Sequence, residues 1–332
     1  MNTKYLQFNT AELQLAGELI RQGQLVAFPT ETVYGLGANA YDEIAVKNTY
    51  IAKGRPSDNP LIVHIWNKSQ IYEIAREVSP DADKVISLMP ASLTVVLPKK
   101  EIIPNCVTAG LDTVAIRMPS SVQAREFLRY AKVPVAAPSA NLSGRPSPTC
   151  WERVKEDMDG KISAILCGNA CQVGIESTVL DLTREEPIVL RPGIVTPEEL
   201  SKVLGKSVRV LTNPKSKVNS PGVRYKHYAP KVPMALDLED DCAKLCAYYD
   251  QKVAEGFNPV IWACNPSRFG NRNVKAMACE AEGVAQELYE TLRHLETKYD
   301  CIIAGFGNND LSGEVSLGIV DRLKKAAGGN VI

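Results

Sequence analysis

The sequence predicts an α/β (α+β) protein, in which a large mixed sheet with flanking helices precedes a smaller α/β domain. Three observations lead to this prediction. Runs rich in β-branched residues alternate with amphipathic helical stretches over the first two thirds of the chain. Some of these strand candidates follow each other without an intervening helix, unlike a strict βαβ repeat. A fresh alternation then begins at Val232, and the polar stretch over residues 210–233 contains four prolines.

Helix and strand candidates follow in order along residues 1–211. Residues 11–23 have the apolar period of an amphipathic helix and end at a glycine. Residues 79–88 begin with Ser79 as N-cap and a proline in the first turn, and residues 196–205 begin with a capping box. A helix is also predicted over 43–53, and strands over 25–28, 61–65, 93–97, 113–118, 133–137, 162–167, 177–182 and 187–190.

Residues 212–231 are interpreted as a linker, because they are polar, contain prolines and show no period. The linker separates a domain over 1–211 from a second domain over 232–332. In the second domain, strands predicted over 233–238, 259–264 and 300–306 alternate with helices over 243–256, 284–295 and 318–329. This order indicates a small Rossmann-like unit. It contains no GxGxxG motif, so the predicted fold does not imply a dinucleotide.

Charge and composition restrict the function. Lys plus Arg and Asp plus Glu each total 38, so the formal net charge is zero. A protein that binds nucleic acid or anionic membrane over a whole face is usually basic, so any anion site here is local. No apolar run reaches the length of a membrane span, and the N-terminus has no targeting pattern. Nine scattered cysteines without CxxC indicate reduced thiols. We therefore expect a cytoplasmic protein that does not act on a membrane.

Local anion binding is predicted by cations that precede prolines. Lys53 and Arg55 occur in KGRP, Arg117 in AIRMP at the end of a strand, and Arg191 in LRPG. Strand alternation places Val114 and Ile116 on one face and Arg117 on the other. A single arginine is most often part of a surface ion pair. Three similar segments weaken that interpretation, because an arginine among apolar strand residues needs a partner or a ligand.

Three segments rich in hydroxyl groups lie at the ends of strand candidates. The segments 29–37 and 137–149 come after a strand, whereas Ser177 and Thr178 of 174–182 begin one. Ordinary turn chemistry explains one such segment, but three at strand ends can line a polar crevice. The chain has neither a P-loop nor a GxSxG motif, and its three histidines form no nucleophile pair. His64 lies in an apolar run and on that ground is a core histidine. Catalysis by positioning and charge neutralisation is therefore favoured over a covalent intermediate.

Seven motifs together resemble the threonylcarbamoyl-AMP synthases, in the two-domain form with a YrdC-like domain and a C-terminal α/β domain. The resemblance covers essentially the whole chain and rests on segments 29–37, 53–61, 115–119, 137–149, 174–182, 190–193 and 220–230. One segment departs from the family pattern. Met89-Pro90-Ala91-Ser92 stands where the family usually has an aromatic residue followed by Pro-Gly-Pro. We expect altered packing there and no loss of chemistry.

The resemblance implies an adenylate-forming enzyme, L-threonylcarbamoyladenylate synthase. Such an enzyme converts L-threonine, bicarbonate or CO2, and ATP into threonylcarbamoyl-AMP and pyrophosphate. A downstream transferase complex then uses the product to make N6-threonylcarbamoyladenosine in tRNA, so stable tRNA binding by this chain is not expected. Mg2+ is expected with the ATP, held mainly by phosphate oxygens.

The resemblance also assigns site residues. It implies that Lys53 and Arg55 neutralise ATP phosphates and that residues 212–231 close over the nucleotide as a lid. It implies a threonine pocket formed by Thr32, His64, Arg117, Ala137 and Ser177, so His64 becomes a functional residue. It implies an ATP site formed by Arg55, Asn59, Thr113, Ser139, Asn141, Ser147, Arg191 and Tyr228.

A double-stranded-RNA-binding or ribosome-maturation module is the alternative function. It is disfavoured by the neutral net charge and by the lack of interleaved aromatic and basic residues. A carbamoyl-transfer domain of the hydrogenase-maturation type also resembles the first domain. That system occurs in a much larger chain with acylphosphatase and zinc segments, which this sequence does not contain.

Overall fold

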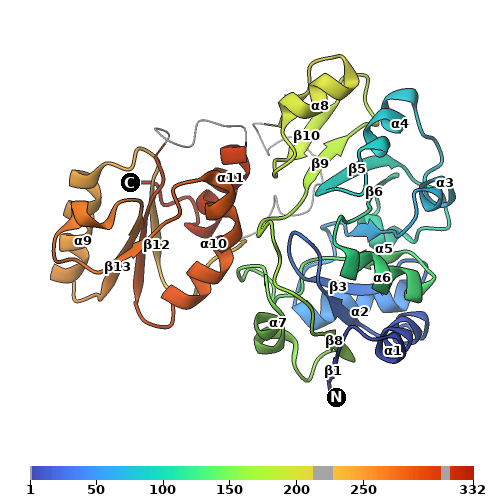
Figure 1. Cartoon of the computed structure of the whole chain (residues 1–332), viewed down its shortest axis with the longest axis horizontal. Coiled ribbons are helices and arrows are strands. Elements are labelled where there is room, and N and C mark those ends of the chain that lie inside the picture. Colours follow the sequence, from blue (N-terminus) through green and yellow to red (C-terminus); the bar gives the residue numbers. More distant parts are fainter. Residues whose placement is uncertain (1, 212–226, 308–314) are drawn as a thin grey trace. The chain divides into compact units, whose positions relative to one another are not determined.

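A computed structural model of the chain describes residues 2–211, 227–307 and 315–332, which form two compact units (Figure 1). Unit 1 contains residues 2–143 and 147–211, and unit 2 contains residues 144–146 with those described from 227 onward. The predicted domain bounds of 1–211, 212–231 and 232–332 stay predictions, and most of the predicted linker lies outside the described residues. Residues 144–146 belong to unit 2 although they follow a strand of unit 1.

The sheet of unit 1 is mixed, as the sequence predicts. Its eleven strands have the order β1-β8-β2-β3-β7-β4-β6-β5-β9-β10-β11. Strand β4 is parallel to β6 on one side and antiparallel to β7 on the other. The strands are β1 (Lys4–Leu6), β2 (Val26–Phe28), β3 (Gly35–Asn39), β4 (Ile62–His64), β5 (Leu93–Pro98), β6 (Thr113–Arg117), β7 (Val135–Ala137), β8 (Ala164–Leu166), β9 (Thr178–Asp181), β10 (Ile188–Arg191) and β11 (Arg209–Val210).

The two faces of this sheet pack against different helices. Val26 and Phe28 of β2 pack with α1 (Thr10–Arg21) and α6 (Val122–Ala131), whereas Ala27 between them belongs to a larger apolar core on the other face. That larger core also contains side chains of α2 (Glu43–Lys53), α3 (Ser69–Ile74), α4 (Pro80–Ser87), α5 (Asn105–Thr108), α7 (Trp151–Met158) and α8 (Pro197–Leu204). We call the sheet face that packs into this larger core the core face.

The predicted local signals are confirmed. Helix α2 spans Glu43–Lys53 as predicted, Ser79 caps α4, and Thr196 with Glu199 forms the capping box of α8. The interpretation of residues 29–37 as a turn was wrong for its last part, because Gly35 and Gly37 lie in β3. A side chain at Gly35 would come within 3.1 Å of the Phe28 ring. A Cβ at Gly37 would come within 2.8 Å of Val135 Cγ1, so packing in β3 favours glycine, whose low strand propensity hid the strand.

Unit 2 contains a four-stranded parallel sheet of order β12-β15-β13-β14, which confirms the Rossmann-like prediction. Its inner strands are almost wholly apolar and buried, as expected for a parallel sheet that is covered on both faces. The elements are β12 (Met234–Asp237), α9 (Cys242–Ala254), β13 (Pro259–Ala263), η1 (Pro266–Phe269), β14 (Val274–Ala276), α10 (Ala281–Leu295), β15 (Cys301–Gly305) and α11 (Val315–Ala326).

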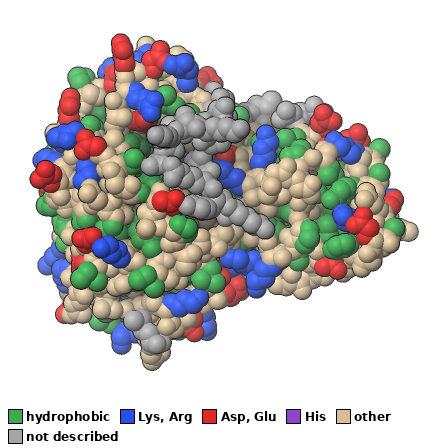
Figure 2. Space-filling view, turned by 180° about the vertical axis from the view of Figure 1, so that it is seen from behind, with side chains coloured by type: hydrophobic (Ala, Val, Ile, Leu, Met, Phe, Trp, Pro, Cys, Tyr) green, Lys and Arg blue, Asp and Glu red, His purple; other side chains and the backbone are tan. Residues whose placement is uncertain are grey.

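The surface agrees with the balanced charge. On the face of the molecule in Figure 2, Lys and Arg side chains are interspersed with Asp and Glu side chains and form no single basic patch. A search of the described helices for a stretch with the length and hydropathy of a membrane span finds none.

Candidate active site

Polar side chains of unit 1 lie on the sheet face opposite to the core face, and we call this second face the site face. Val63 of β4 and Ile116 of β6 point into the larger core, so the adjacent residues His64 and Arg117 point to the site face. His64 and Arg117 are also register partners in the parallel β4–β6 pair. Ala137 of β7 packs away from the core face as well. Three residues predicted to bind threonine therefore share one surface.

Arg191 reaches the site face through a β-bulge. Val189 pairs with Leu180, and both belong to the larger core. The register then shifts, and Arg191 pairs with Val179, the neighbour of Leu180 that points to the opposite face. An extra residue in one strand re-aims the following side chain in this way. Without the bulge, Arg191 would share the orientation of Val189 and point into the core.

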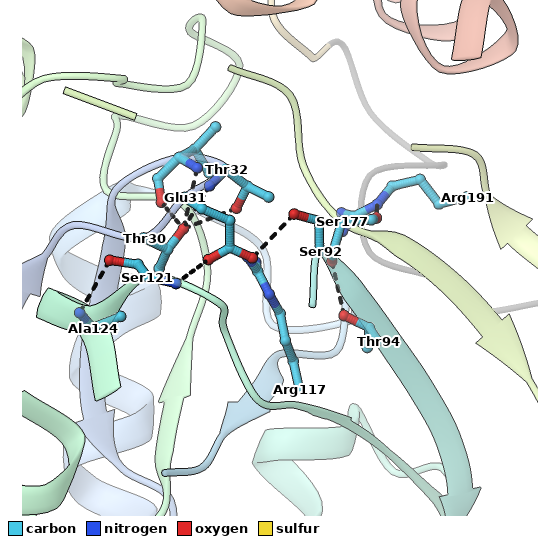
Figure 3. A network of polar contacts seen from close by, with 11 residues as sticks. Thr30, Glu31, Thr32, Ser92, Thr94, Arg117, Ser121, Ala124, Ser177 and Arg191 are labelled. Carbon is cyan, nitrogen blue, oxygen red and sulfur yellow. Dashed lines mark hydrogen bonds and ion pairs between the residues drawn. The ribbon is translucent and has the colours of Figure 1, made fainter. Parts of the chain in front are cut away.

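On the site face, Arg191 contacts Ser177, as Figure 3 shows. Its Nε donates to the Ser177 carbonyl oxygen at 3.0 Å, and its Nη2 donates to Ser177 Oγ at 3.2 Å. The Ser177 hydroxyl also lies 2.8 Å from Thr94 Oγ1 of β5. The structure thus brings together Ser177, predicted to bind threonine, and Arg191, predicted to bind ATP.

Arg117 forms a buried ion pair that the sequence did not predict. Its Nη2 donates to Glu31 Oε1 at 2.6 Å, and both side chains are almost fully buried (Figure 3). Ser92 Oγ donates to the same carboxylate oxygen at 3.1 Å, and the backbone N–H of Ser121 donates to Oε2 at 3.3 Å. Burial alone would raise the pKa of Glu31, but the charge and hydrogen bond of Arg117 lower the pKa overall. The carboxylate is therefore ionised at neutral pH.

The imidazole of His64 is neutral. Burial, and then the nearby charge of Arg117, lowers the pKa of His64 to about 3. Its Nδ1 lies 3.1 Å from the carbonyl oxygen of Ile62, and its ring contacts the Phe28 ring edge-on at a centroid distance of 5.7 Å. Because the unperturbed pKa of histidine is near 6.5, a proton on this ring is strongly disfavoured. His64 can therefore offer shape and hydrogen bonding, but not positive charge.

Lys53 and Arg55 have different environments, although the sequence suggested a cationic pair on one loop. Lys53 is the last residue of α2 and is buried. Its Nζ donates to the carbonyl oxygens of Ser139 and Asn141, the latter at 2.7 Å. Lys53 therefore holds the turn that carries two predicted ATP residues. Its predicted contact with phosphate stays a prediction.

Arg55 is half-buried and lines a cavity. Its Nη2 donates to the carbonyl oxygen of Asn59 at 3.1 Å. The cavity has a volume of about 940 Å3 and is also lined by Lys47, Tyr50 and Asn105. The structure thus places Arg55 where a ligand can reach it and brings it together with Asn59.

The remaining predicted residues occupy separate places. Thr113 begins β6 on the same face as Arg117, about 13 Å away along the strand at 3.3 Å per residue. Ser147 Oγ donates to Glu176 Oε1 at 2.7 Å. Glu176 is the residue directly before Ser177 in the chain. The Thr32 hydroxyl lies 2.9 Å from that of Thr30. Tyr228 lies in unit 2, where its ring stacks on Tyr289. Its predicted contact with the nucleotide therefore stays a prediction.

Two family models match consecutive parts of the chain. A model described as "Telomere recombination" matches residues 18–193, and one described as "Threonylcarbamoyl-AMP synthase, C-terminal domain" matches residues 195–328. Two curated relatives are named threonylcarbamoyl-AMP synthase. The relative from Pyrococcus abyssi is 40% identical over 97% of this chain and 95% of its own. The relative from Bacillus subtilis is 43% identical over 99% of this chain and 97% of its own.

Solved structures resemble the chain as well. The crystal structure of P. abyssi Sua5 complexed with L-threonine has a TM-score of 0.92 at 38% identity, over 100% of this chain and 99% of that chain. The crystal structure of E. coli YciO has a TM-score of 0.52 at 22% identity, over 58% of this chain and 97% of that chain. The likeness to YciO shows a common fold alone.

Proposed function

This chain belongs to the threonylcarbamoyl-AMP synthase family, and from that premise we propose that it joins L-threonine, bicarbonate or CO2, and ATP into threonylcarbamoyl-AMP and pyrophosphate. The product serves N6-threonylcarbamoyladenosine synthesis in tRNA, through a downstream transferase complex. The single observation that carries the proposal is the shared site face. Arg117 of β6, Arg191 of β10, neutral His64 of β4 and the hydroxyl contact between Thr94 and Ser177 lie on it.

The threonine half of the site centres on Arg117. A guanidinium suits a carboxylate because its planar fork presents parallel donors. We assign the α-carboxylate of threonine to Arg117 and place the substrate against Thr32, Ala137 and Ser177. Neutral His64 offers hydrogen-bonding groups next to the threonine substrate and, because it carries no positive charge, does not attract a second anion. The P. abyssi relative was crystallised with L-threonine, which supports threonine as the substrate of this half.

The ATP half uses Arg55, Asn59, Thr113, Ser139, Asn141, Ser147 and Arg191. In the reaction, the threonine amine takes up CO2 and loses a proton to give a carbamate. A carbamate oxygen then attacks the α-phosphorus of ATP, and pyrophosphate leaves. Both reactants are anionic, so bringing them together is a large part of the barrier. Fixed cations such as Arg55 and Arg191 lower that barrier where water is excluded.

Mg2+ completes the proposal. Among the residues that the structure describes, no group of three or more His, Cys, Asp or Glu side chains could hold a metal ion. We propose that Mg2+ binds together with ATP and takes its ligands mainly from phosphate oxygens, whose charge it would neutralise when bound. The predicted lid over residues 212–231 stays a prediction, because residues 212–226 lie outside the described residues, and so does the predicted contact of Tyr228 with the nucleotide.

Pyrophosphate release tests the proposal. With ATP, bicarbonate and L-threonine together, we expect steady release, and omission of threonine should reduce it to background. Mass spectrometry of the mixture should show threonylcarbamoyl-AMP. Equal release with L-serine, or with no amino acid, would contradict the threonine assignment. Tight and steeply salt-dependent binding of double-stranded RNA without nucleotide would support an RNA-binding function instead.

A further inference from the structure

We propose that Glu31 is a positioning residue of the threonine site, which holds one end of the Arg117 guanidinium so that its remaining donors meet the amino-acid carboxylate. This inference rests on the proposed function, which assigns that carboxylate to Arg117. Nothing in the family resemblance assigned a role to Glu31. The proposal follows from the contacts of the two side chains in unit 1 (Figure 3).

Glu31 is fixed from several directions. Its two carboxylate oxygens accept from the Ser92 hydroxyl and the Ser121 backbone, in addition to Arg117. Its own carbonyl oxygen accepts from the Val173 backbone N–H at 2.8 Å. The neighbouring Thr30 hydroxyl donates to the Val33 carbonyl oxygen at 2.7 Å and so closes the turn. A carboxylate anchored in this way does not swing aside when a ligand arrives, so it stays bound to Arg117 during the reaction.

Arg117 keeps donors for a ligand. A guanidinium has five N–H groups, and within the described residues Arg117 donates one hydrogen bond, from Nη2 to Glu31. In the part of the chain that the structure describes, the buried Nε has no hydrogen-bond partner, and the side chain is 4% exposed. Buried donors are almost always paired, so this nitrogen marks a place where an acceptor is missing. A ligand carboxylate beside the guanidinium supplies that acceptor.

Glu31 also keeps the Arg117 guanidinium buried before the substrate binds. A buried guanidinium without a counter-charge is costly, and the favoured alternative is a rotated side chain that reaches water. The ion pair with Glu31 removes that alternative. The substrate then meets a guanidinium that is already oriented on the site face, so less conformational freedom is lost on binding.

Ser92 links this inference to the one departure from the family pattern. It occupies a position where the family usually has proline, and its hydroxyl donates to Glu31 at 3.1 Å. Proline has no side-chain donor and could not make this contact. The altered segment therefore supports the carboxylate that holds Arg117. Because the Arg117 and Ser121 contacts do not depend on Ser92, its hydroxyl contributes the smaller share.

The central experiment compares Glu31→Gln with the unchanged full-length protein. Calorimetry should give L-threonine dissociation constants, and pyrophosphate release should give KM for both substrates. We expect threonine to bind about tenfold more weakly, because one charge-assisted hydrogen bond to Arg117 is lost. KM for ATP should change less than about twofold. Glu198→Gln, the same substitution in an exposed ion pair with Lys202, is the matched control and should change neither value. Ser92→Ala should weaken threonine binding by less than Glu31→Gln.

The double variant Arg117→Ala/Glu31→Gln tells a positioning role of Glu31 from a merely structural one. In Arg117→Ala protein, Glu31→Gln should cause no further loss of threonine affinity, because Glu31 acts through Arg117. An equal loss in that background would overturn the inference. Tighter threonine binding by Glu31→Gln would also overturn it, because Glu31 would then compete with the substrate carboxylate.

Two further outcomes keep the inference distinct from the proposed function. If Arg117→Ala weakens threonine binding but Glu31→Gln does not, only the positioning role is wrong. If Arg117→Ala leaves threonine binding unchanged, the threonine site and this inference are both wrong. If the Glu31→Gln protein does not fold, Glu31→Asp replaces it in the experiment. This substitution keeps the negative charge but moves the carboxylate away from Arg117 by one methylene. Its threonine affinity should still fall, and unchanged affinity would overturn the inference.

Discussion

Buried arginines occur in both units, but their surroundings differ. Arg117 lies on strand β6 of unit 1, where a carboxylate holds it beside a neutral histidine. No described residue accepts a hydrogen bond from its Nε. Arg293 lies on α10 of unit 2, and its Nε and Nη2 both donate to the Pro146 carbonyl oxygen, at 3.2 and 2.7 Å. The contacts of Arg117 leave N–H donors for a ligand, whereas two donors of Arg293 are already hydrogen-bonded to a backbone carbonyl. Burial of an arginine therefore does not by itself identify a site, and the case for Arg117 rests on the remaining donors together with His64 beside them on the same face.

The strands of the two units show the same contrast. In unit 2, β13 and β15 are continuous apolar runs and their side chains pack on both faces. In unit 1, β4 and β6 each end in a buried polar residue, His64 or Arg117, that follows apolar strand residues. A sheet that only has to pack needs no such residues, because each one requires a hydrogen-bond partner. The polar ends of β4 and β6, like the buried Asp237 at the end of β12 in unit 2, therefore depend on partners that β13 and β15 do not need.

Arg117→Ala should have the largest effect. We expect kcat/KM for threonine to fall by at least about 100-fold, because the substrate carboxylate loses its partner and Glu31 is left as a buried unpaired charge. KM for ATP should change much less. Arg117→Lys should be intermediate, since an ammonium cannot form the fork. Steady-state pyrophosphate assays at varied threonine and at varied ATP measure both values, and an unchanged threonine dependence would remove the role given to Arg117.

Arg293→Ala should affect stability rather than substrate use. We expect a loss of about 2 kcal/mol in the free energy of unfolding, because the Pro146 carbonyl loses two charged donors. KM for threonine should remain within about twofold of the unchanged protein. Urea denaturation followed by circular dichroism measures the first quantity, with Lys298→Ala on the surface as control. A threonine defect as large as that of Arg117→Ala would contradict the comparison.

Arg55→Ala tests the second half of the site. We expect KM for ATP to rise by about tenfold, the cost of one charge-assisted contact with phosphate, while KM for threonine stays nearly constant. Lys47→Ala, at the same cavity, serves as the control for general loss of positive charge. Equal rises in both KM values would indicate a disturbed loop, because the two substrates are assigned to different residues.

The neutral state of His64 predicts a pH dependence of stability. Its pKa is about 3 in the folded protein and near 6.5 when unfolded, so the unfolded state binds more protons between these values. The contribution is complete above pH 6.5 and is lost as pH falls towards 3, by at most about 1.4 kcal/mol per pH unit. Urea denaturation at pH 6.5 and 5.5 should show a smaller pH effect in His64→Gln. The same pH effect in both proteins would contradict the assignment.

Several features could be predicted from the sequence because their causes are local. The bounds of α2, the N-cap of α4 and the capping box of α8 depend on residues within a few positions of each other. The face of Arg117 was predictable for a similar reason, since strand side chains alternate with a period of two. The family motifs also named Arg117, Ser177 and Arg191 in advance, and the structure brings Ser177 and Arg191 into contact.

Other features could not be predicted from local signals. Glu31 and Arg117 are 86 residues apart, and nothing near Glu31 indicates which cation it pairs with. Its only signal was a carboxylate in a turn otherwise rich in hydroxyl groups. The orientation of Arg191 depends on a one-residue bulge, and alternation from Val189 alone would have pointed it into the core. The assignment of residues 144–146 to unit 2 also had no sequence signal.

Local signals in the sequence specified the elements with clear periods and caps, such as α2, α4 and α8, and the chemical groups at several strand ends, whereas β3 was missed. These properties follow from side-chain period, capping and backbone preference, which act over a few residues. Only the tertiary structure decided that β4 lies between β6 and β7, that Arg191 turns to the site face, and that Glu31 neutralises Arg117. Strand order and ion pairing depend on packing between distant segments, and the energy of a buried charge depends on everything that surrounds it.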